Sequence, residues 1–309
     1  MPPPIIASDG EAGADNLYNG DDVVQITTQA EKPMPLFTIM LPIIRPPALL
    51  PHAVRSVQNQ TVADWELFII LDGAPPETLA AARALAAEDP RIRVRPFPKG
   101  ERNGEAHRHV VLGEARGIYV AQIADDDLWF PRHLAELRLL LAEADFGNLP
   151  QCEITLDGRP MLLHGNLASA KMRKAIMTKR GNFFGPSCAG YRRMTYDRLP
   201  IGWSPAPTGV YSDQYMWRKF LALPDIRVAT RFSIQAAKLE SRVRQHLTLE
   251  ARADEMAALA EQIATADGRS DIVTRALRDA MWVEAAWASR SWRIKERVRR
   301  MRRAFHAVD

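Results

Sequence analysis

Cysteine is scarce in this chain, and long apolar runs are absent. The 309 residues include only Cys152 and Cys188, without a C-x-x-C spacing, so neither a disulfide framework nor a cysteine zinc site is indicated. No apolar run reaches the roughly 18 residues of a membrane-spanning helix. The N-terminus also lacks the basic and apolar regions of a secretory signal. We therefore expect a cytoplasmic protein.

Two nucleotide-binding motifs are also missing. No G-x-G-x-x-G follows an expected strand, which argues against a dinucleotide-dependent dehydrogenase. Residues 42–47, after the first expected strand, contain no glycine, whereas a sugar-phosphate nucleotidylyltransferase would need a glycine-rich phosphate loop there. The composition is ordinary for a globular protein, with 47% hydrophobic and 25% charged residues, and the length permits a sizeable core.

A regular alternation of apolar runs and helical patterns extends from Leu36 to Ala144. The apolar runs predict buried strands, and the segments between them have apolar or alanine-rich positions at helical spacing. This order predicts an α/β fold, a mostly parallel sheet flanked by helices on both faces. We expect strands at 36–41, 65–71, 92–94 and 119–123, and helices at 50–60, 77–87, 103–112 and 132–144.

The pattern is looser after Phe146. We expect strands at 160–164 and 226–232, a helix that follows Asp213, and almost continuous helix from Leu239 with one break near Asp267. Residues 1–35 are rich in Pro, Gly, Asp and Asn, which predicts a flexible extension.

Three consecutive carboxylates, Asp125, Asp126 and Asp127, follow the fourth expected strand. Open α/β sheets bind ligands at the carboxyl ends of their strands. Adjacent negative charges repel, and a divalent cation such as Mg²⁺ or Mn²⁺, which prefers oxygen ligands, would cancel that repulsion. An acidic triplet can also serve only to stabilise the start of the next helix, but the buried strand before it favours a site.

The order of these features resembles that of the family 2 glycosyltransferases, which have the GT-A fold, over residues 36–232. The resemblance rests on an ordered set of segments: the first strand ending in Leu41-Pro42, then residues 56–61, 66–73, 104–119, 125–131 and 212–217. It implies a GT-A domain over residues 36–238, followed by a helical C-terminal extension over residues 239–309.

The resemblance also implies a reaction and a set of site residues. The reaction is an inverting, metal-dependent transfer of a sugar, hexosyltransferase-like, from a nucleotide-diphosphate sugar to a hydroxyl acceptor in surface polysaccharide or glycoconjugate synthesis. The family suggests UDP as the nucleotide and Mn²⁺ or Mg²⁺ as the metal. Donor-binding residues would be Pro42, Ile44, Asp72, Arg108, Asp125 and Asp126, the metal ligands Asp126 and Asp127, and the general base Asp213.

The alignment of the acidic motif leaves two alternatives. Counted back from Pro131, the first acid of the family's DxD falls at Ala124, so that Asp126 is the second; alternatively, Asp125 and Asp127 form the pair. The family's turn acid falls at Leu71, and its Glu-Asp pair reads Ser212-Asp213. These departures keep open a catalytically silent nucleotide-sugar-binding or scaffold protein.

Each assignment also has a structural alternative. Asp213 can simply cap the helix after it, and Asp72 before Gly73 is ordinary turn chemistry. Arg108 lies with His107 and His109 on an expected helix, and a solvated helix face explains this group better than phosphate contact. Arg192 and Arg193 fit a diphosphate contact and surface charge equally well.

The C-terminal helix is strongly basic. Between Arg290 and Arg303 it has eight Lys or Arg residues against the single acid Glu296, and an apolar stripe of Trp287, Ile294, Val298, Met301 and Phe305. This suits a helix lying on an anionic membrane at its inner face, or one packing on its own domain or a partner. No recognition motif indicates nucleic acid. The expected partners are a nucleotide sugar and a glycan, lipid-linked or protein acceptor.

Overall fold

The computed structural model describes residues 34–305 except 164 and 182; of residues 287 and 292–305 it describes the backbone alone. The extension expected over residues 1–35 falls almost wholly outside the described residues, so its flexibility stays a prediction.

A seven-stranded sheet forms the centre of the fold, in the order β10-β6-β9-β4-β1-β2-β3. The first four strands in sequence pair parallel, β9 runs antiparallel to β4 and β6, and β10 is parallel to β6. The predicted α/β class with a mostly parallel sheet is confirmed. The strands are β1 Phe37–Ile43, β2 Trp65–Asp72, β3 Ile92–Phe97, β4 Tyr119–Gln122, β6 Phe146–Asn148, β9 Ala189–Arg192 and β10 Val228–Thr230.

Helices cover both faces of this sheet because its strands are apolar on both sides. In β1, Ile39 and Leu41 belong to one buried cluster, with α1, α2 and α4, whereas Met40 belongs to the other, with α3, α5, α6 and α7. The helices are α1 Leu50–Gln58, α2 Pro76–Glu88, α3 Glu105–Glu114, α4 His133–Glu143, α5 Ala170–Thr178, α6 Arg193–Tyr196 and α7 Ser212–Leu221, with the short 3-10 helix η1 at Pro186–Cys188.

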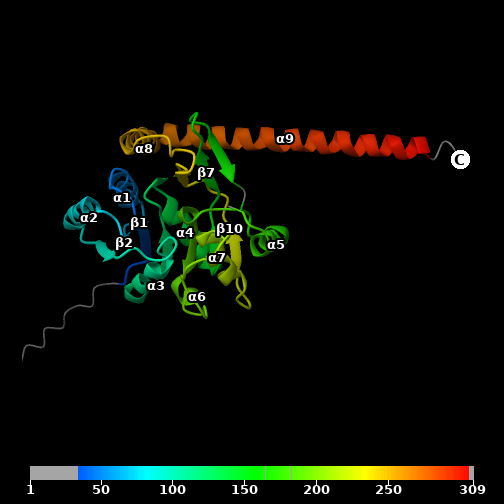
Figure 1. Ribbon diagram of the computed structural model, residues 1–309. Coiled ribbons are helices and arrows are strands. Elements are labelled where there is room, and N and C mark those ends of the chain that lie inside the picture. Colours follow the sequence, from blue (N-terminus) through cyan, green and yellow to red (C-terminus); the bar gives the residue numbers. More distant parts are fainter. Residues whose placement is uncertain (1–33, 164, 182, 306–309) are drawn as a thin grey trace, which may run out of the picture. The chain divides into compact units, whose positions relative to one another are not determined.

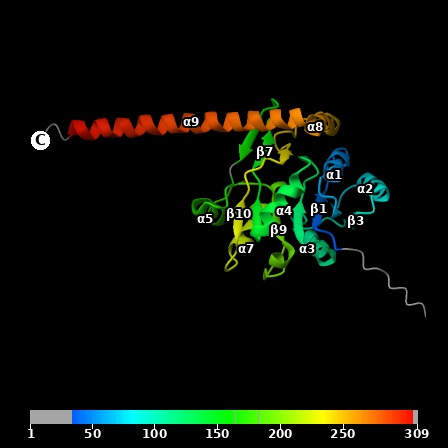
Figure 2. The ribbon, with the colours of Figure 1, turned by 180° about the vertical axis from the view of Figure 1, so that it is seen from behind.

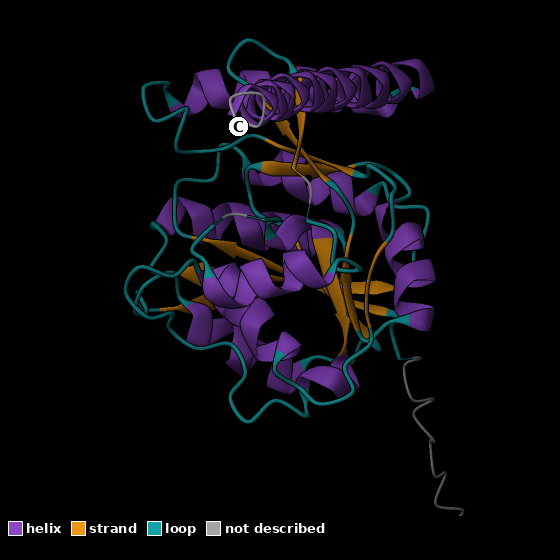
Figure 3. Ribbon diagram, turned by 90° about the vertical axis from the view of Figure 1, so that its right-hand side faces the viewer, coloured by secondary structure: helices purple, strands orange, loops and turns teal. Residues whose placement is uncertain are grey.

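A second sheet of four strands, in the order β5-β11-β7-β8, was not predicted. It lies between the main sheet and the last helix (Figure 3). One consequence is that β4 ends before the acidic triplet, and Asp127 begins a strand of the second sheet. The strands are β5 Asp127–Trp129, β7 Gln151–Ile154, β8 Pro160–Leu163 and β11 Ala236–Lys238.

The C-terminal helices begin ten residues later than expected. Residues 239–248 are not helical, because fully buried Arg244 binds Glu255 and the Ile154 carbonyl oxygen and so holds this segment against β7. Helix α8 (Leu249–Ala264) follows, capped by Thr248, and α9 (Ala266–Phe305) starts after a break at Thr265. Helix α8 lies beside α1, while α9 extends past the rest of the described chain (Figures 1 and 2). Among the described helices, none has the length and hydrophobicity to cross a membrane.

Buried His133 predicts a pH-dependent stability. Its ring stacks on Trp129 at 4.2 Å and its Nδ1 lies 3.1 Å from the Gln235 carbonyl oxygen. Burial lowers the pKa of His133 from 6.5 to about 3, so below pH 6.5 the unfolded chain binds a proton that the folded chain excludes. We therefore expect the free energy of unfolding to fall as the pH decreases below 6.5. Because one proton is involved, the slope does not exceed about 1.4 kcal/mol per pH unit.

The measurement is a series of thermal or urea unfolding curves between pH 7 and about 4.5. His133→Gln keeps a side-chain donor for the Gln235 carbonyl but does not titrate, so its stability should vary less with pH over that interval. Equal slopes for both proteins would contradict the buried, neutral imidazole.

Candidate active site at the carboxyl edge of the sheet

The carboxyl ends of β1, β2 and β4 meet at one edge of the main sheet, because these strands are parallel. Arg45 follows β1, Asp72 ends β2, and the acidic triplet follows β4. Of the two further donor-binding predictions, Pro42 lies in β1 beside Ile70 of β2, and Ile44 lies just beyond β1, 47% exposed. The structure therefore brings most of the predicted donor-binding residues to the same edge.

The triplet Asp125–Asp127, which we call the acidic corner, is almost fully buried. Arg45 pairs with two of its carboxylates: Nε lies 3.0 Å from Asp125 Oδ2, and Nη1 lies 3.5 Å from Asp126 Oδ2. Arg252 of α8 lies 3.5 Å from Asp126 Oδ2, and the Ser241 hydroxyl donates a hydrogen bond to the same oxygen. Arg45 and Arg252 therefore offset part of the negative charge of the triplet, which the sequence analysis expected a divalent cation to cancel.

Asp127 has different neighbours from Asp126. Ser187 Oγ donates a 2.5 Å hydrogen bond to its Oδ2, and Lys238 of β11 stands opposite it in the β5–β11 register. Burial, with the nearby charge of Asp126, raises the pKa of Asp127 to about 8, and the charge of Lys238 opposes this. The same two causes raise the pKa of Asp125 to about 7. The corner is therefore short of positive charge despite the arginines.

The donor set of the acidic corner fits a hard divalent cation. Asp127 Oδ1 is buried and has no hydrogen-bond partner among the described residues. No group of three or more His, Cys, Asp or Glu side chains in the described part of the chain is arranged to hold a metal ion. Mg²⁺ is usually bound by one or two carboxylates, with substrate phosphates completing the shell, so metal binding by the two acids Asp126 and Asp127 stays a prediction.

Asp72 ties down the loop before α3. It accepts hydrogen bonds from Gly100 N at 2.6 Å and Lys99 Nζ at 2.9 Å, and is 4% exposed. Gly104 has a φ of 60°, and a Cβ there would lie 2.5 Å from the Asp72 carboxylate, so this approach requires glycine. These contacts favour the turn interpretation, and nucleotide binding by Asp72 stays a prediction.

Arg108 is buried, so the solvated-face interpretation is wrong for this residue. Its guanidinium lies 5.1 Å from the Trp203 ring, and Nη1 donates to the Asn103 carbonyl oxygen at 3.1 Å. Burial lowers its pKa, while the charges of Glu105, Asp72 and Asp213 oppose the change. Arg108 is thus a buried cation among carboxylates, near both Asp72 and Asp213.

Asp213 is the second residue of α7 and is half-buried. The N-cap position belongs to Tyr211, and within the described part of the chain the Asp213 carboxylate accepts a hydrogen bond from Gln214 N at 2.8 Å. Burial raises its pKa, and the charges of Lys238 and Arg108 oppose this rise. Asp72 binds Lys99 and Gly100, and Asn103 of the same loop binds Ser212, so the end of β2 and the predicted base border the same region.

A carboxylate from α3 stands beside the serine of the Ser212-Asp213 pair. Ser212 Oγ donates a 2.5 Å hydrogen bond to Oε1 of fully buried Glu105, and accepts one from Asn103 Nδ2 at 2.6 Å. The family's motif has an acid at position 212, where this chain has serine. A carboxylate is still present beside that position, but it comes from Glu105, more than one hundred residues earlier in the chain.

Sequence reasoning missed several residues of this site, which are Arg45, Glu105, Ser187, Lys238, Ser241 and Arg252. Only Arg45 had a usable signal, since it follows the first strand at the ligand-binding edge. Arg192 and Arg193 act elsewhere: Arg192 binds the Ala142 and Ala144 carbonyls, and Arg193 pairs with Asp197. Among the described residues, neither forms a hydrogen bond or an ion pair with the acidic corner or Asp213, so surface charge explains them better.

Comparison with known proteins points to one family. Residues 38–199, more than half of the chain, match the model of "Glycosyl transferase family 2". The chain is 32% identical over 98 residues to a chondroitin synthase of Pasteurella multocida, which is 32% of this chain and 10% of that protein. It is 27% identical over 94 residues to a GalNAc(5)-diNAcBac-PP-undecaprenol beta-1,3-glucosyltransferase of Campylobacter jejuni, 30% of either chain.

Solved structures share the fold. Residues 1–349 of S. aureus TarS superpose with a TM-score of 0.54 at 16% identity, covering 71% of this chain and 68% of that one. A second crystal structure of the same TarS segment, in complex with UDP-GlcNAc, gives a TM-score of 0.52 at 16% identity and covers 66% and 58% of the two chains. The match to the family model, with this fold, shows that the chain belongs to glycosyl transferase family 2.

Proposed function

We propose that the chain transfers a sugar from a nucleotide-diphosphate sugar to an acceptor hydroxyl, with inversion of the anomeric carbon. The observation that carries this proposal is that carboxylates from distant parts of the chain border one region. The acidic corner and Asp72 lie at the ligand-binding edge of the sheet, and the loop that Asp72 holds contacts Ser212, next to Asp213, through Asn103. The family match supports it.

The donor would bind along the carboxyl edge. Pro42 and Ile44 would contact the base or ribose, as would Asp72 after release of Lys99. Asp125 would accept from the ribose hydroxyls, and Arg108 would approach the phosphates. The bound UDP-GlcNAc in one TarS crystal supports UDP as the first nucleotide to test.

Asp126 and Asp127 would hold a Mn²⁺ or Mg²⁺ ion. When bound, such an ion acts as a Lewis acid that stabilises the departing diphosphate. The chain's own cations add to this effect: Arg45 is 24% exposed on its side chain and pairs with the corner through Nε and Nη1. Lys238 lies beside Asp127. Both would add positive charge beside the phosphates of a bound donor.

Asp213 would accept the proton of the attacking hydroxyl. Burial raises its pKa, which makes it a stronger base, and the charges of Lys238 and Arg108 oppose this rise. Attack from the Asp213 side, opposite the departing diphosphate, inverts the anomeric configuration. Glu105, hydrogen-bonded to Ser212, would hold the start of α7 in place.

The acceptor would be a glycan intermediate of surface polysaccharide or glycoconjugate synthesis, carried by a lipid. The names of the Pasteurella and Campylobacter relatives, a chondroitin synthase and an undecaprenol-linked glucosyltransferase, support this choice. The protein would act in the cytoplasm, with the basic segment 290–303 of α9 attracted to the anionic inner face of the membrane.

A thermal-shift panel of nucleoside diphosphates, each with and without Mn²⁺, tests this function. A ligand that binds the native state raises the melting temperature, so we expect UDP with Mn²⁺ to give a larger shift than UDP or Mn²⁺ alone. A panel without any Mn²⁺-dependent shift would contradict the donor site. Binding without turnover of any nucleotide sugar would instead indicate a catalytically silent protein.

A further inference from the structure

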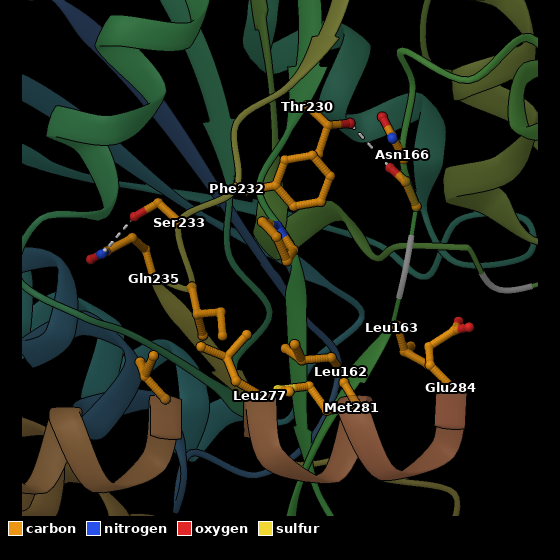
Figure 4. Close-up of a pocket in the computed structure, with 15 residues that line it drawn as sticks. Leu162, Leu163, Asn166, Thr230, Phe232, Ser233, Gln235, Leu277, Met281 and Glu284 are labelled. Carbon is orange, nitrogen blue, oxygen red and sulfur yellow. Dashed lines mark hydrogen bonds between the residues drawn. The ribbon is translucent and has the colours of Figure 1, made fainter. Parts of the chain in front are cut away.

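A groove with a volume of about 560 Å³ lies between α9, β8 and the segment that joins β10 to β11. Its walls are mainly apolar, and Figure 4 shows Leu277 of α9 on one side and Phe232 on the other. Phe232 is 72% exposed and Met281 is 73% exposed. Such adjoining apolar surface, at a volume typical of ligand pockets, indicates a binding site.

The charge of α9 indicates what kind of ligand fits. Val273, Leu277, Ala280 and Glu284 line the groove at alternating four- and three-residue spacing. In the sequence the same spacing continues through Trp287, Ser291 and Ile294 into a segment with eight basic residues and one acid. An apolar groove followed by strong positive charge matches a molecule with a hydrocarbon body and an anionic group.

The same charge argues against a second copy of the chain. Pairing two α9 helices along this stripe would place Arg290, Lys295, Arg297 and Arg302 beside it, at the positions that face the partner helix in a coiled coil. Like charges at these positions repel. An anionic lipid meets no such opposition.

Short stretches of chain connect the groove to the candidate active site. Pro150 lines it, and the next residue, Gln151, accepts a hydrogen bond from Gly185 N, two residues before the Ser187 that binds Asp127. On another side, Gly165 leads into α5, which accepts a hydrogen bond from Gln214 Nε2 at the Ile176 carbonyl, next to Asp213. A ligand in the groove would thus contact Pro150 and Gly165, which the chain connects to the segments that hold Asp127 and Asp213.

We propose that this groove binds the hydrocarbon tail of a lipid-phosphate-linked acceptor, with its phosphate toward the basic part of α9. This inference rests on the proposed transfer function, whose acceptor it specifies. The bulk membrane would contact α9 without needing a groove, whereas an individual acceptor has to be held near the sugar that it receives.

The test uses the full chain and a diazirine analogue of farnesyl phosphate as a photolabel. We expect the label on peptides that contain residues 160–163, 231–235 or 273–284, and competition by unlabelled farnesyl phosphate but not by inorganic phosphate. Ala280→Trp fills the groove and should weaken labelling about tenfold or more. Ala286→Trp, an exposed position on the same helix outside the groove lining, should label as the parent chain does.

A second variant, Leu277→Gln, guards against misfolding of Ala280→Trp, and it should also weaken labelling while melting near the parent temperature. Labelling confined to residues 286–305 would overturn the groove, because it would show attraction by charge alone. Equal labelling of Ala280→Trp and the parent would overturn it too. Hydrolysis of a nucleotide sugar is measured for the same variants. It reports on the transfer function separately, because neither substitution changes the acidic corner or Asp213.

Discussion

Asp213→Asn is expected to reduce the turnover of a nucleotide sugar by about 10²–10⁴-fold, the usual contribution of a positioned general base. Asparagine keeps the shape of the side chain and can still accept from Gln214 N, which is the only hydrogen bond that Asp213 accepts in the described chain. What it loses is the capacity to accept a proton. The nucleotide-induced thermal shift should persist, because the substitution leaves the proposed donor-binding residues along the carboxyl edge unchanged.

The pH profile separates this role from a structural one. Burial raises the pKa of Asp213 above 3.8, and the reaction requires its ionised form, so kcat/KM should fall as the pH decreases through the raised pKa. Asp197→Asn is a matched control, because Asp197 is a surface residue that pairs with Arg193; its profile should follow that of the parent. A normal rate for Asp213→Asn would exclude Asp213 as the base.

Asp126→Asn is expected to lower turnover about 10²–10³-fold, as the loss of a group that stabilises charge in the transition state does, and to raise the Mn²⁺ concentration needed for half-maximal rate. One alignment of the DxD motif makes Asp126 its second acid, and the other places Asp126 between the two acids of the motif. In either case Asp126 lies at the proposed metal site. Rates are measured over a Mn²⁺ titration, with the melting temperature followed in parallel, since Arg45 and Arg252 lose an ion-pair partner.

Ser241→Ala provides the control for Asp126. It removes the hydroxyl that donates to Asp126 Oδ2 but leaves the carboxylate charge, so the Mn²⁺ requirement should change little. If Asp126→Asn loses stability yet keeps the parent's Mn²⁺ dependence, Asp126 has a structural role with Arg45 and Arg252 rather than a metal-binding role.

The first half of the fold was predictable because its elements carry their signals locally. The runs at Leu36–Leu41 and Trp65–Leu71 are apolar on both faces, as strands buried between helices must be, and they became β1 and β2. Parallel pairing then placed Asp72 and the acidic corner at one edge. The predicted donor-binding residues of the early strands follow from this single rule.

The second sheet was not predictable in the same way. Strands β5 and β11 have three residues each, and they pair across a separation of more than one hundred residues. So short a segment gives too little periodicity to distinguish strand from helix. Residues 236–238 therefore gave no strand signal, and Lys238, which lies opposite Asp127 in this sheet, was missed for the same reason.

Burial also depended on partners that sequence spacing does not show. Arg108 looked solvated beside His107 and His109, but Trp203 covers it from a distant segment. Glu105 lies near the start of a predicted helix and was not singled out from the sequence, yet it accepts a hydrogen bond from Ser212. In both cases the chemistry of the residue type was clear, and the missing information was the tertiary neighbour that removes water from it.

A crystal structure with UDP and Mn²⁺ tests the central claim most directly. The account predicts an ion coordinated by Asp126 or Asp127 and by the diphosphate, with the nucleotide along the carboxyl ends of β1 and β2 and Asp213 facing the sugar site from the opposite side. Nucleotide bound elsewhere, or no ion at the acidic corner at saturating Mn²⁺, would contradict it.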